Sequence, residues 1–155
     1  MTSENTPRAQ SVPIHTESNE GASTHWIDLI TVAGQLIAAV ERAVEAVGAD
    51  FASVFRSVRL ELADDYSFLD PFSSRFQYSN SVVRLTESVS VGAFVNGICE
   101  ALRRVVDQIA IGNQETRVRE RVAVELAVLA RERAAALQST GFRDELDRVA
   151  RTKVI

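Results

Sequence analysis

The sequence has few of the residues on which many enzymes and metal sites depend. Cys99 is the single cysteine in 155 residues, so the chain cannot form an internal disulfide or a cysteine-based metal site. The two histidines, His15 and His25, lie near the N-terminus, away from any cluster that would complete a Ser-His-Asp or Cys-His arrangement. We therefore expect a non-enzymatic protein without a cofactor or bound metal, in which Cys99 is a small, half-buried hydrophobic residue.

Motifs for phosphate or divalent cations are also missing. The seven glycines are scattered and form no glycine-rich phosphate loop. Asp64, Asp65 and Asp70 gather around one loop, but their spacing lacks the alternating ligands of a calcium loop, so we interpret them as solvated turn residues. Glu41 and Glu45 are one helical turn apart, and no Glu-x-x-His motif accompanies them to build a di-metal site.

Long apolar runs are absent. The longest uncharged stretch, residues 29–40, is well below the roughly 20 residues that a membrane span needs. The first residues lack the basic start and apolar run of a secretory signal. Together with the single cysteine, these features predict a cytoplasmic protein.

The chain has no excess of basic charge. Its formal net charge is -4, which argues against a general nucleic-acid binder. Residues 1–112 carry 8 basic and 14 acidic side chains, whereas residues 113–155 carry 9 and 7. The arginines of the second part alternate with glutamates, a pattern typical of a solvent-facing helix. A regulatory DNA-binding protein that uses this part is one alternative.

What the sequence does contain is a β-hairpin pattern near residues 75–86. Apolar and polar residues alternate on both sides of Asn80-Ser81, which suits a two-residue turn. The predicted cross-strand pairs are Tyr78 with Val83 and Phe76 with Leu85. This register places all four side chains on one face of the hairpin, and the agreement between register and apolar pattern supports it.

Helical periodicity predicts the other elements. The first expected helix covers residues 26–47, with one apolar face and a stop at Gly48, and the second covers residues 51–62, capped by Asp50. The third begins after Ser88 or Ser90 and ends at Gly112, the fourth covers residues 114–138, capped by Asn113, and a short last helix lies near 142–149. We therefore predict an α+β, predominantly helical fold with the order helix, helix, hairpin, two long helices and a short helix. Residues 1–24 are expected to form a disordered tail, and residues 25–155 a single domain.

The polar sides of two predicted helices carry charged residues. On the second helix, Arg59 lies opposite the apolar face, so we expect it to face water. On the third helix, Glu100–Arg104 and Arg103–Asp107 are one turn apart and are expected to form ion pairs.

Two sets of apolar side chains are candidates for partner binding. Val124 and Val128 lie one turn apart on the fourth helix, away from its main apolar stripe. Phe72, Phe76 and Tyr78 surround a hairpin that is not stable as an isolated pair of strands. Each set either packs inside the domain or contacts a partner. The connection that contains Phe72 is itself expected to pack over the edge of the core.

These features predict a small protein-interaction module, an adaptor or regulatory subunit that self-associates or binds a partner protein. The alternative from another class is a protein that binds an apolar or aromatic small molecule between the hairpin and the helices. Such a pocket would be flanked by Tyr66 or Tyr78 and by an arginine or aspartate.

Overall fold

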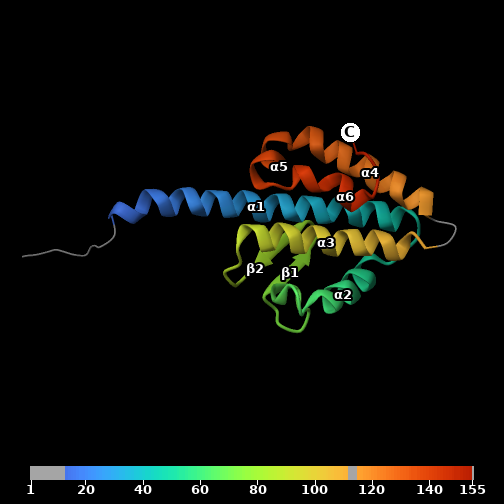
Figure 1. The fold of residues 1–155 in the computed structure, drawn as a ribbon, viewed down its shortest axis with the longest axis horizontal. Coiled ribbons are helices and arrows are strands. Elements are labelled where there is room, and N and C mark those ends of the chain that lie inside the picture. Colours follow the sequence, from blue (N-terminus) through green and yellow to red (C-terminus); the bar gives the residue numbers. More distant parts are fainter. Residues whose placement is uncertain (1–12, 112–114, 155) are drawn as a thin grey trace, which may run out of the picture.

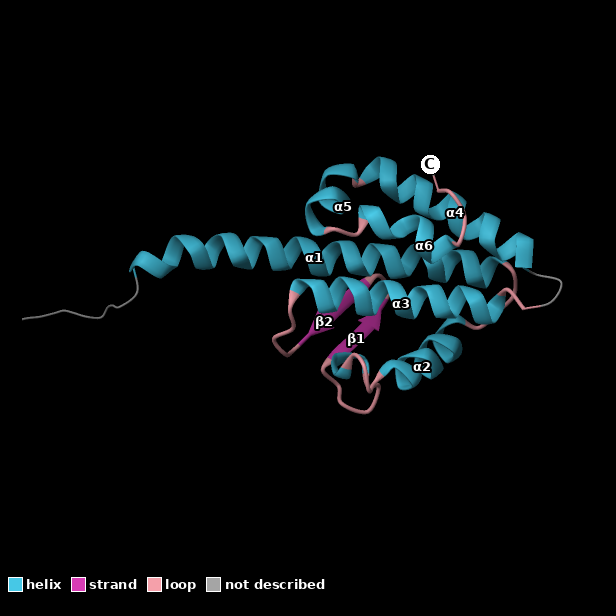
Figure 2. Ribbon diagram, in the orientation of Figure 1, coloured by secondary structure: helices cyan, strands magenta, loops and turns pink. Residues whose placement is uncertain are grey.

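The computed structural model describes residues 13–111 and 115–154, with the backbone alone for residues 13–24. Six α-helices and one two-stranded antiparallel hairpin make up this described part. Figure 2 shows that helices dominate and that the hairpin lies among them. The predicted fold class, a predominantly helical single domain with a hairpin between helices, is confirmed.

The long helix α1 (Pro13–Ala46) runs through the middle of the molecule (Figure 1). Helices α4 and α5 pack on one side of it, and β2 and α3 pack on the other. Because α1 has neighbours on both sides, Ala38 and Ala39 are buried as well as Leu36 and Ile37. The prediction of a single apolar face on this helix is therefore incomplete, because α1 buries side chains on two sides.

The predicted end of α1 is confirmed, whereas its predicted start is not. The helix ends at Ala46, and Gly48 follows with φ +86°, which confirms the predicted stop at a left-handed glycine. The start was predicted at Trp26, and this is wrong because the helix begins at Pro13. Of the predicted disordered tail, residues 13–24 belong to α1, while residues 1–12 lie outside the described residues.

Helix α2 (Phe51–Leu62) follows a short turn, and the Asp50 side chain caps it by accepting a hydrogen bond from the backbone N–H of Ser53. Its buried side chains are Phe51, Phe55, Val58 and Leu62, as the apolar pattern predicts. The connection to the hairpin contains a short 3₁₀ helix, η1 (Ser67–Leu69), whose Phe68 and Leu69 are buried.

Strands β1 (Phe76–Ser79) and β2 (Val82–Leu85) pair antiparallel. Phe76 is opposite Leu85 and Tyr78 is opposite Val83, so the predicted register is confirmed. Asn80 and Ser81 have φ +50° and +70°, as a two-residue turn that follows the strand twist requires. The apolar face of the hairpin packs against α1.

Helix α3 (Val91–Ile109) lies alongside α1 (Figure 1). Ser90 caps it, accepting a hydrogen bond from the backbone N–H of Ala93, which confirms one of the two predicted starts. Its last residue is Ile109, and the predicted end at Gly112 lies outside the described residues. Its apolar stripe is buried from Phe94 to Val106.

The C-terminal part contains two helices where the periodicity predicts one. Helix α4 (Glu115–Glu132) is followed by Arg133, whose φ of -127° and ψ of 38° lie outside the helical region. Helix α5 (Ala134–Thr140) begins at the next residue. After Gly141, η3 (Arg143–Glu145) and α6 (Leu146–Ala150) bring the chain back alongside α3 and α4. The predicted short last helix is confirmed, and the predicted cap at Asn113 lies outside the described residues.

Among the described residues, none of the helices combines the length and the apolar character needed to span a bilayer.

Candidate functional site

The predicted contact residues lie in two separate parts of the molecule. Val124 on α4 is 60% exposed and Val128 is partly buried. Phe72, after η1, is 71% exposed, whereas Tyr78 on β1 is partly buried. Phe76 is 1% exposed because its ring packs against two other phenylalanines. Phe76 is therefore a core residue rather than a contact residue.

The outward side of α4 combines apolar and positively charged side chains. We call this surface the α4 face, and its members are Arg117, Arg121, Val124, Val128 and Arg131. At 3.6 residues per turn these five positions share one side of the helix, and all except Val128 are exposed. Within residues 13–111 and 115–154, none of its three arginines has a carboxylate at ion-pair distance. Glu120 and Glu132 are exposed at the two edges of this side, so the α4 face carries three arginines, against two bordering glutamates, around an exposed apolar centre.

A second exposed surface lies at the C-terminal end of α2. We call it the α2 corner, and its members are Arg56, Leu60, Asp64, Asp65 and Phe72. The first three are spaced by four residues along one side of the helix and the following turn. Leu60 is 53% exposed, both aspartates are exposed, and the Arg56 guanidinium lies 5.1 Å from the centroid of the Phe72 ring. The prediction that Phe72 packs over the core edge is wrong.

A pocket of about 350 Å³ lies between α2 and the hairpin. Phe51 and Phe55, which are 1% and 5% exposed, form its floor, with ring centroids 5.1 Å apart and planes inclined by 24°. The Tyr78 ring meets both of them edge-on, at centroid distances of 6.4 Å. Arg56 and Arg59 also line this space. We call it the α2–hairpin pocket, and its position and lining match the pocket that the small-molecule alternative requires.

Arg59 is held in this pocket by backbone carbonyls. Its Nε donates to the Leu69 carbonyl at 2.9 Å and its Nη2 to the Phe76 carbonyl at 2.8 Å. Burial, followed by the positive charge of Arg56, lowers the pKa of the Arg59 guanidinium, and Asp70 only partly offsets this. The prediction that Arg59 faces water is therefore wrong, because its donors reach two carbonyls that only the folded chain brings together.

Tyr78 connects the pocket to α1. Its hydroxyl donates to a Glu41 carboxylate oxygen at 2.6 Å, and Glu41 also lines the pocket. Burial, and then the hydrogen bond to this carboxylate, raise the pKa of the Tyr78 hydroxyl. The Glu41 carboxylate thus already has a donor inside the protein.

A larger hollow of about 400 Å³ lies beside Trp26, Ile30 and residues 85–89. Glu87 is the one charged residue of its lining, and it pairs with Arg75 at 2.6 Å. This hollow therefore presents no uncompensated charge to a ligand, in contrast to the α2–hairpin pocket.

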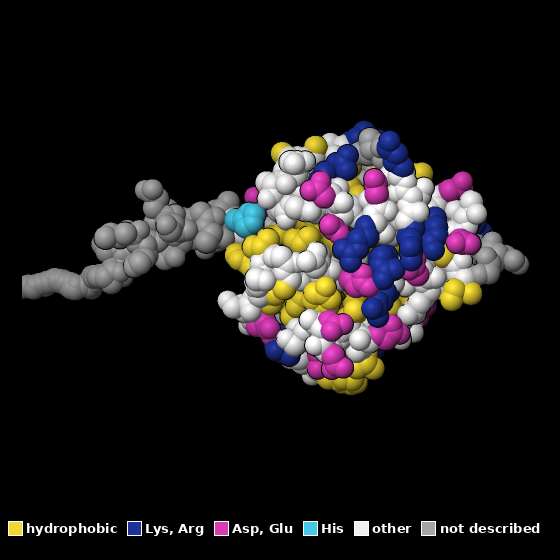
Figure 3. All heavy atoms as spheres, in the orientation of Figure 1, with side chains coloured by type: hydrophobic (Ala, Val, Ile, Leu, Met, Phe, Trp, Pro, Cys, Tyr) yellow, Lys and Arg dark blue, Asp and Glu magenta, His cyan; other side chains and the backbone are white. Residues whose placement is uncertain are grey.

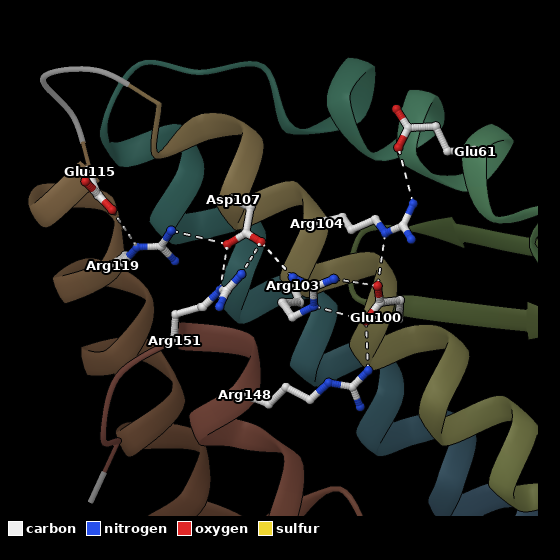
Figure 4. A network of polar contacts seen from close by, with 9 residues as sticks. All are labelled: Glu61, Glu100, Arg103, Arg104, Asp107, Glu115, Arg119, Arg148 and Arg151. Carbon is white, nitrogen blue, oxygen red and sulfur yellow. Dashed lines mark hydrogen bonds and ion pairs between the residues drawn. The ribbon is translucent and has the colours of Figure 1, made fainter.

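A network of ion pairs connects α3 to three other helices (Figure 4). At one end, Glu100 accepts hydrogen bonds from Arg103, Arg104 and, on α6, Arg148. These hydrogen bonds, of which the one from Arg103 has the largest effect, lower the pKa of Glu100 to about 2, although burial by itself would raise it. Arg104 also approaches Glu61 on α2. The predicted Glu100–Arg104 pair is confirmed.

At the other end of the network, Asp107 accepts from Arg103, Arg119 and Arg151. Burial alone would raise the pKa of Asp107, but the hydrogen bonds from Arg151 and Arg119 lower it. Figure 3 shows a band of basic side chains on this face of the molecule, with acidic side chains beside it. The predicted Arg103–Asp107 pair is confirmed, while helical spacing could not reveal the partners on α4 and α6.

The remaining chemical candidates do not assemble into a site. Cys99 is fully buried rather than half-buried, and burial raises the pKa of its thiol. Asp64 and Asp65 are exposed, and Asp70 accepts a hydrogen bond from the backbone N–H of Phe72. Within the part of the chain that the structure describes, no three histidine, cysteine, aspartate or glutamate side chains converge as metal ligands.

Comparison with protein-family models, with curated proteins and with solved structures finds no match to this chain. The α4 face, the α2 corner and the α2–hairpin pocket therefore carry the functional argument by themselves.

Proposed function

We propose that this protein is a non-enzymatic interaction module that self-associates head to tail. In this arrangement the α4 face of one copy binds the α2 corner of the next. The observation that carries the proposal is the pairing of opposite charge around exposed apolar centres. Val124 and three arginines form one surface, and Leu60, Phe72, Arg56 and two aspartates form the other, which leaves the second surface with a net negative charge.

The apolar centres supply the attraction. Val124 is 60% exposed, Leu60 53% and Phe72 71%, so each surface leaves apolar side chains in water. Burying them between two copies removes this area from solvent. Surrounding charges of opposite sign favour the productive orientation and disfavour other partners.

Charge also favours two different surfaces over one surface paired with itself. In an antiparallel contact between two α4 helices that brings Val124 against Val128, Arg121 of one copy would face Arg131 of the other. The α2 corner instead offers Asp64 and Asp65, which are exposed beside its apolar residues.

The placement of the two surfaces sets the kind of assembly. Helices α4 and α2 lie on opposite sides of α1 (Figure 1). A contact between different surfaces of identical copies is heterologous, so it produces a ring or an open chain rather than a closed pair. An open chain of this kind suits an adaptor, because each end copy keeps one surface free.

Two variants with one broken surface each test the proposal. Val124→Asp with Arg121→Glu disrupts the α4 face, and Leu60→Lys with Phe72→Lys disrupts the α2 corner. In sedimentation velocity at micromolar concentration, the unmodified chain should gain mass with concentration and lose it with added salt. Each variant alone should remain a monomer, and a 1:1 mixture should form a dimer through the one interface whose surfaces are both intact.

The matched control is Val82→Asp. Val82 is 57% exposed and belongs to neither surface, so this change should leave association unaltered. A monomeric unmodified chain would overturn self-association. A variant that still dimerises by itself would show a symmetric interface through its intact surface and overturn the head-to-tail arrangement. A mixture that stays monomeric, while the unmodified chain associates, would also overturn that arrangement.

A separate observation, the α2–hairpin pocket, supports a second candidate function. The α2–hairpin pocket lies between the hairpin and α2, and its lining includes Tyr78 together with Arg56 and Arg59. Its volume of about 350 Å³ falls in the range of small-molecule sites, roughly 300–1,000 Å³. We propose small-molecule binding there as a function separate from self-association.

The DNA-binding alternative has less support. Arg119, Arg148 and Arg151 of the basic C-terminal part are engaged by carboxylates, which reduces the charge left for phosphates. A salt-sensitive gel shift at low ionic strength would favour this alternative.

A further inference from the structure

We propose that the α2–hairpin pocket binds a planar aromatic molecule that carries a negatively charged group. The aromatic part would lie against Tyr78, over the floor that the buried Phe51 and Phe55 form, and the anionic group would contact Arg59 and Arg56. The inference rests on the second proposed function, that this pocket holds a small molecule, and it names the chemical class.

The first step of the argument is the unbalanced charge of Arg59. Its guanidinium is partly buried, and the acceptors that it reaches are the neutral carbonyls of Leu69 and Phe76. Among the described residues, no carboxylate lies within ion-pair distance of it. The guanidinium lies over the Phe76 and Phe55 rings, and the charge of Asp70 offsets the cost of its burial only in part. A desolvated cation favours a negative partner, so an anionic ligand group would complete the counter-charge.

The second step concerns the other charges around the pocket. Arg56, one turn before Arg59 on α2, adds a second positive charge, and the two arginines disfavour each other electrostatically. Glu41 is the acidic residue of the lining, and its carboxylate already accepts the Tyr78 hydroxyl at 2.6 Å. The lining therefore has more positive than negative charge, which disfavours a cationic ligand.

The third step is the shape and nature of the walls. Phe51 and Phe55 are buried and form the floor of the pocket, while Tyr78 is only partly buried and stands at 71° and 86° to them, so the Tyr78 ring is the aromatic surface that a ligand can contact. Aromatic rings favour offset or edge-to-face contact with another aromatic ring. Two arginines beside the Tyr78 ring thus provide a guanidinium for a carboxylate and a surface for a flat ring system.

Three probes of one shape test the ligand class on the full chain. Indole-3-acetate is anionic at neutral pH, indole-3-ethanol is neutral and tryptamine is cationic. In calorimetric titrations we expect indole-3-acetate to bind at least about tenfold more tightly than indole-3-ethanol, a difference of about 1.4 kcal/mol, and tryptamine to bind most weakly. In a ¹H–¹⁵N spectrum, the Arg59 Nε–H signal should shift with indole-3-acetate.

Two variants separate the charge from the cavity. Arg56→Gln, at an exposed position, should reduce the preference for indole-3-acetate over indole-3-ethanol by threefold or more and leave indole-3-ethanol binding unchanged. Ala52→Trp, at another exposed position of the lining, should fill the pocket and abolish binding of both. The control Arg84→Gln removes an equal charge at an exposed position of β2 outside the pocket lining and should change neither affinity.

The outcomes distinguish failure of the ligand class from failure of the pocket. Equal affinity for indole-3-acetate and indole-3-ethanol, with loss of both in Ala52→Trp, would overturn the anionic class and leave the pocket function standing. Binding that persists in Ala52→Trp, or no binding of any probe, would overturn both. Retention of the full anion preference in Arg56→Gln would also overturn the proposed class.

Discussion

The carbonyl oxygen of Ser81 lies directly against the Cα of Gly34, so the tip of the hairpin contacts the middle of α1. A Cβ atom at position 34 would overlap this oxygen. The neighbouring atom belongs to the backbone of a tight turn and cannot rotate away as a side chain can. Gly34 thus sets the distance between α1 and the hairpin, and with it the position of Tyr78 over the α2–hairpin pocket.

Gly34→Ala should therefore lower the free energy of unfolding. Alanine is the better helix former by about 1 kcal/mol, but overpacking a close contact costs about 1–3 kcal/mol, and we expect the contact to prevail. Gly92→Ala on α3 is the matched control, because a Cβ there has open space, and it should be neutral or stabilising. Urea unfolding measures both, and a stabilised Gly34→Ala variant would contradict the contact.

Glu100 should make the domain sensitive to acid. Three arginines hold its pKa at about 2 in the folded protein, below its ordinary value of 4.5. A lowered folded pKa means that the unfolded chain takes up the proton first. The stabilisation is therefore complete above about pH 4.5 and is lost as the pH falls towards 2.

Glu100→Gln should reduce the free energy of unfolding at pH 7 by about 1–2 kcal/mol, allowing for solvent screening of the network. The variant should also lose less stability than the unmodified chain between pH 5 and 3. Denaturant titrations across this range measure the difference. Glu45→Gln, at an exposed position of α1, is the control and should leave the pH profile unchanged.

Cys99 should be chemically silent in the folded protein. It is fully buried, and burial raises the pKa of its thiol, so little reactive thiolate is accessible. Its reaction with Ellman's reagent should be slower than in denaturant by a factor of about 10³ or more, as expected when only unfolding exposes it. A Ser57→Cys variant, with Cys99→Ala, places the thiol at an exposed site and should react rapidly. Rapid reaction of native Cys99 would contradict its burial.

Local patterns predicted much of the fold. The hairpin register from Phe76 to Leu85 follows from alternation and a two-residue turn, and both are confirmed. The caps at Asp50 and Ser90 were also visible, because a cap involves residues only three positions apart. The break at Arg133 was not, because periodicity continues across a residue whose backbone leaves the helical region.

The candidate site was less predictable, because it depends on contacts between distant segments. Val124 and Phe72 carried an apolar signal in the sequence, but which of the apolar residues stay exposed depends on what the other elements cover. Phe76 shows the opposite outcome, since two phenylalanines from α2 and η1 bury it. Arg59 had a polar position on its helix, and nothing nearby in sequence indicated that carbonyls at positions 69 and 76 would receive its donors.

The sequence by itself determined the elements of this protein, since helix periodicity, strand alternation, turns and caps are interactions between residues a few positions apart. The tertiary structure decided which surfaces stay open and where charge is left unbalanced. Burial and electrostatics depend on distance in space, and folding brings Glu100 beside Arg148, 48 positions away, while it leaves the partly buried guanidinium of Arg59 with neutral acceptors.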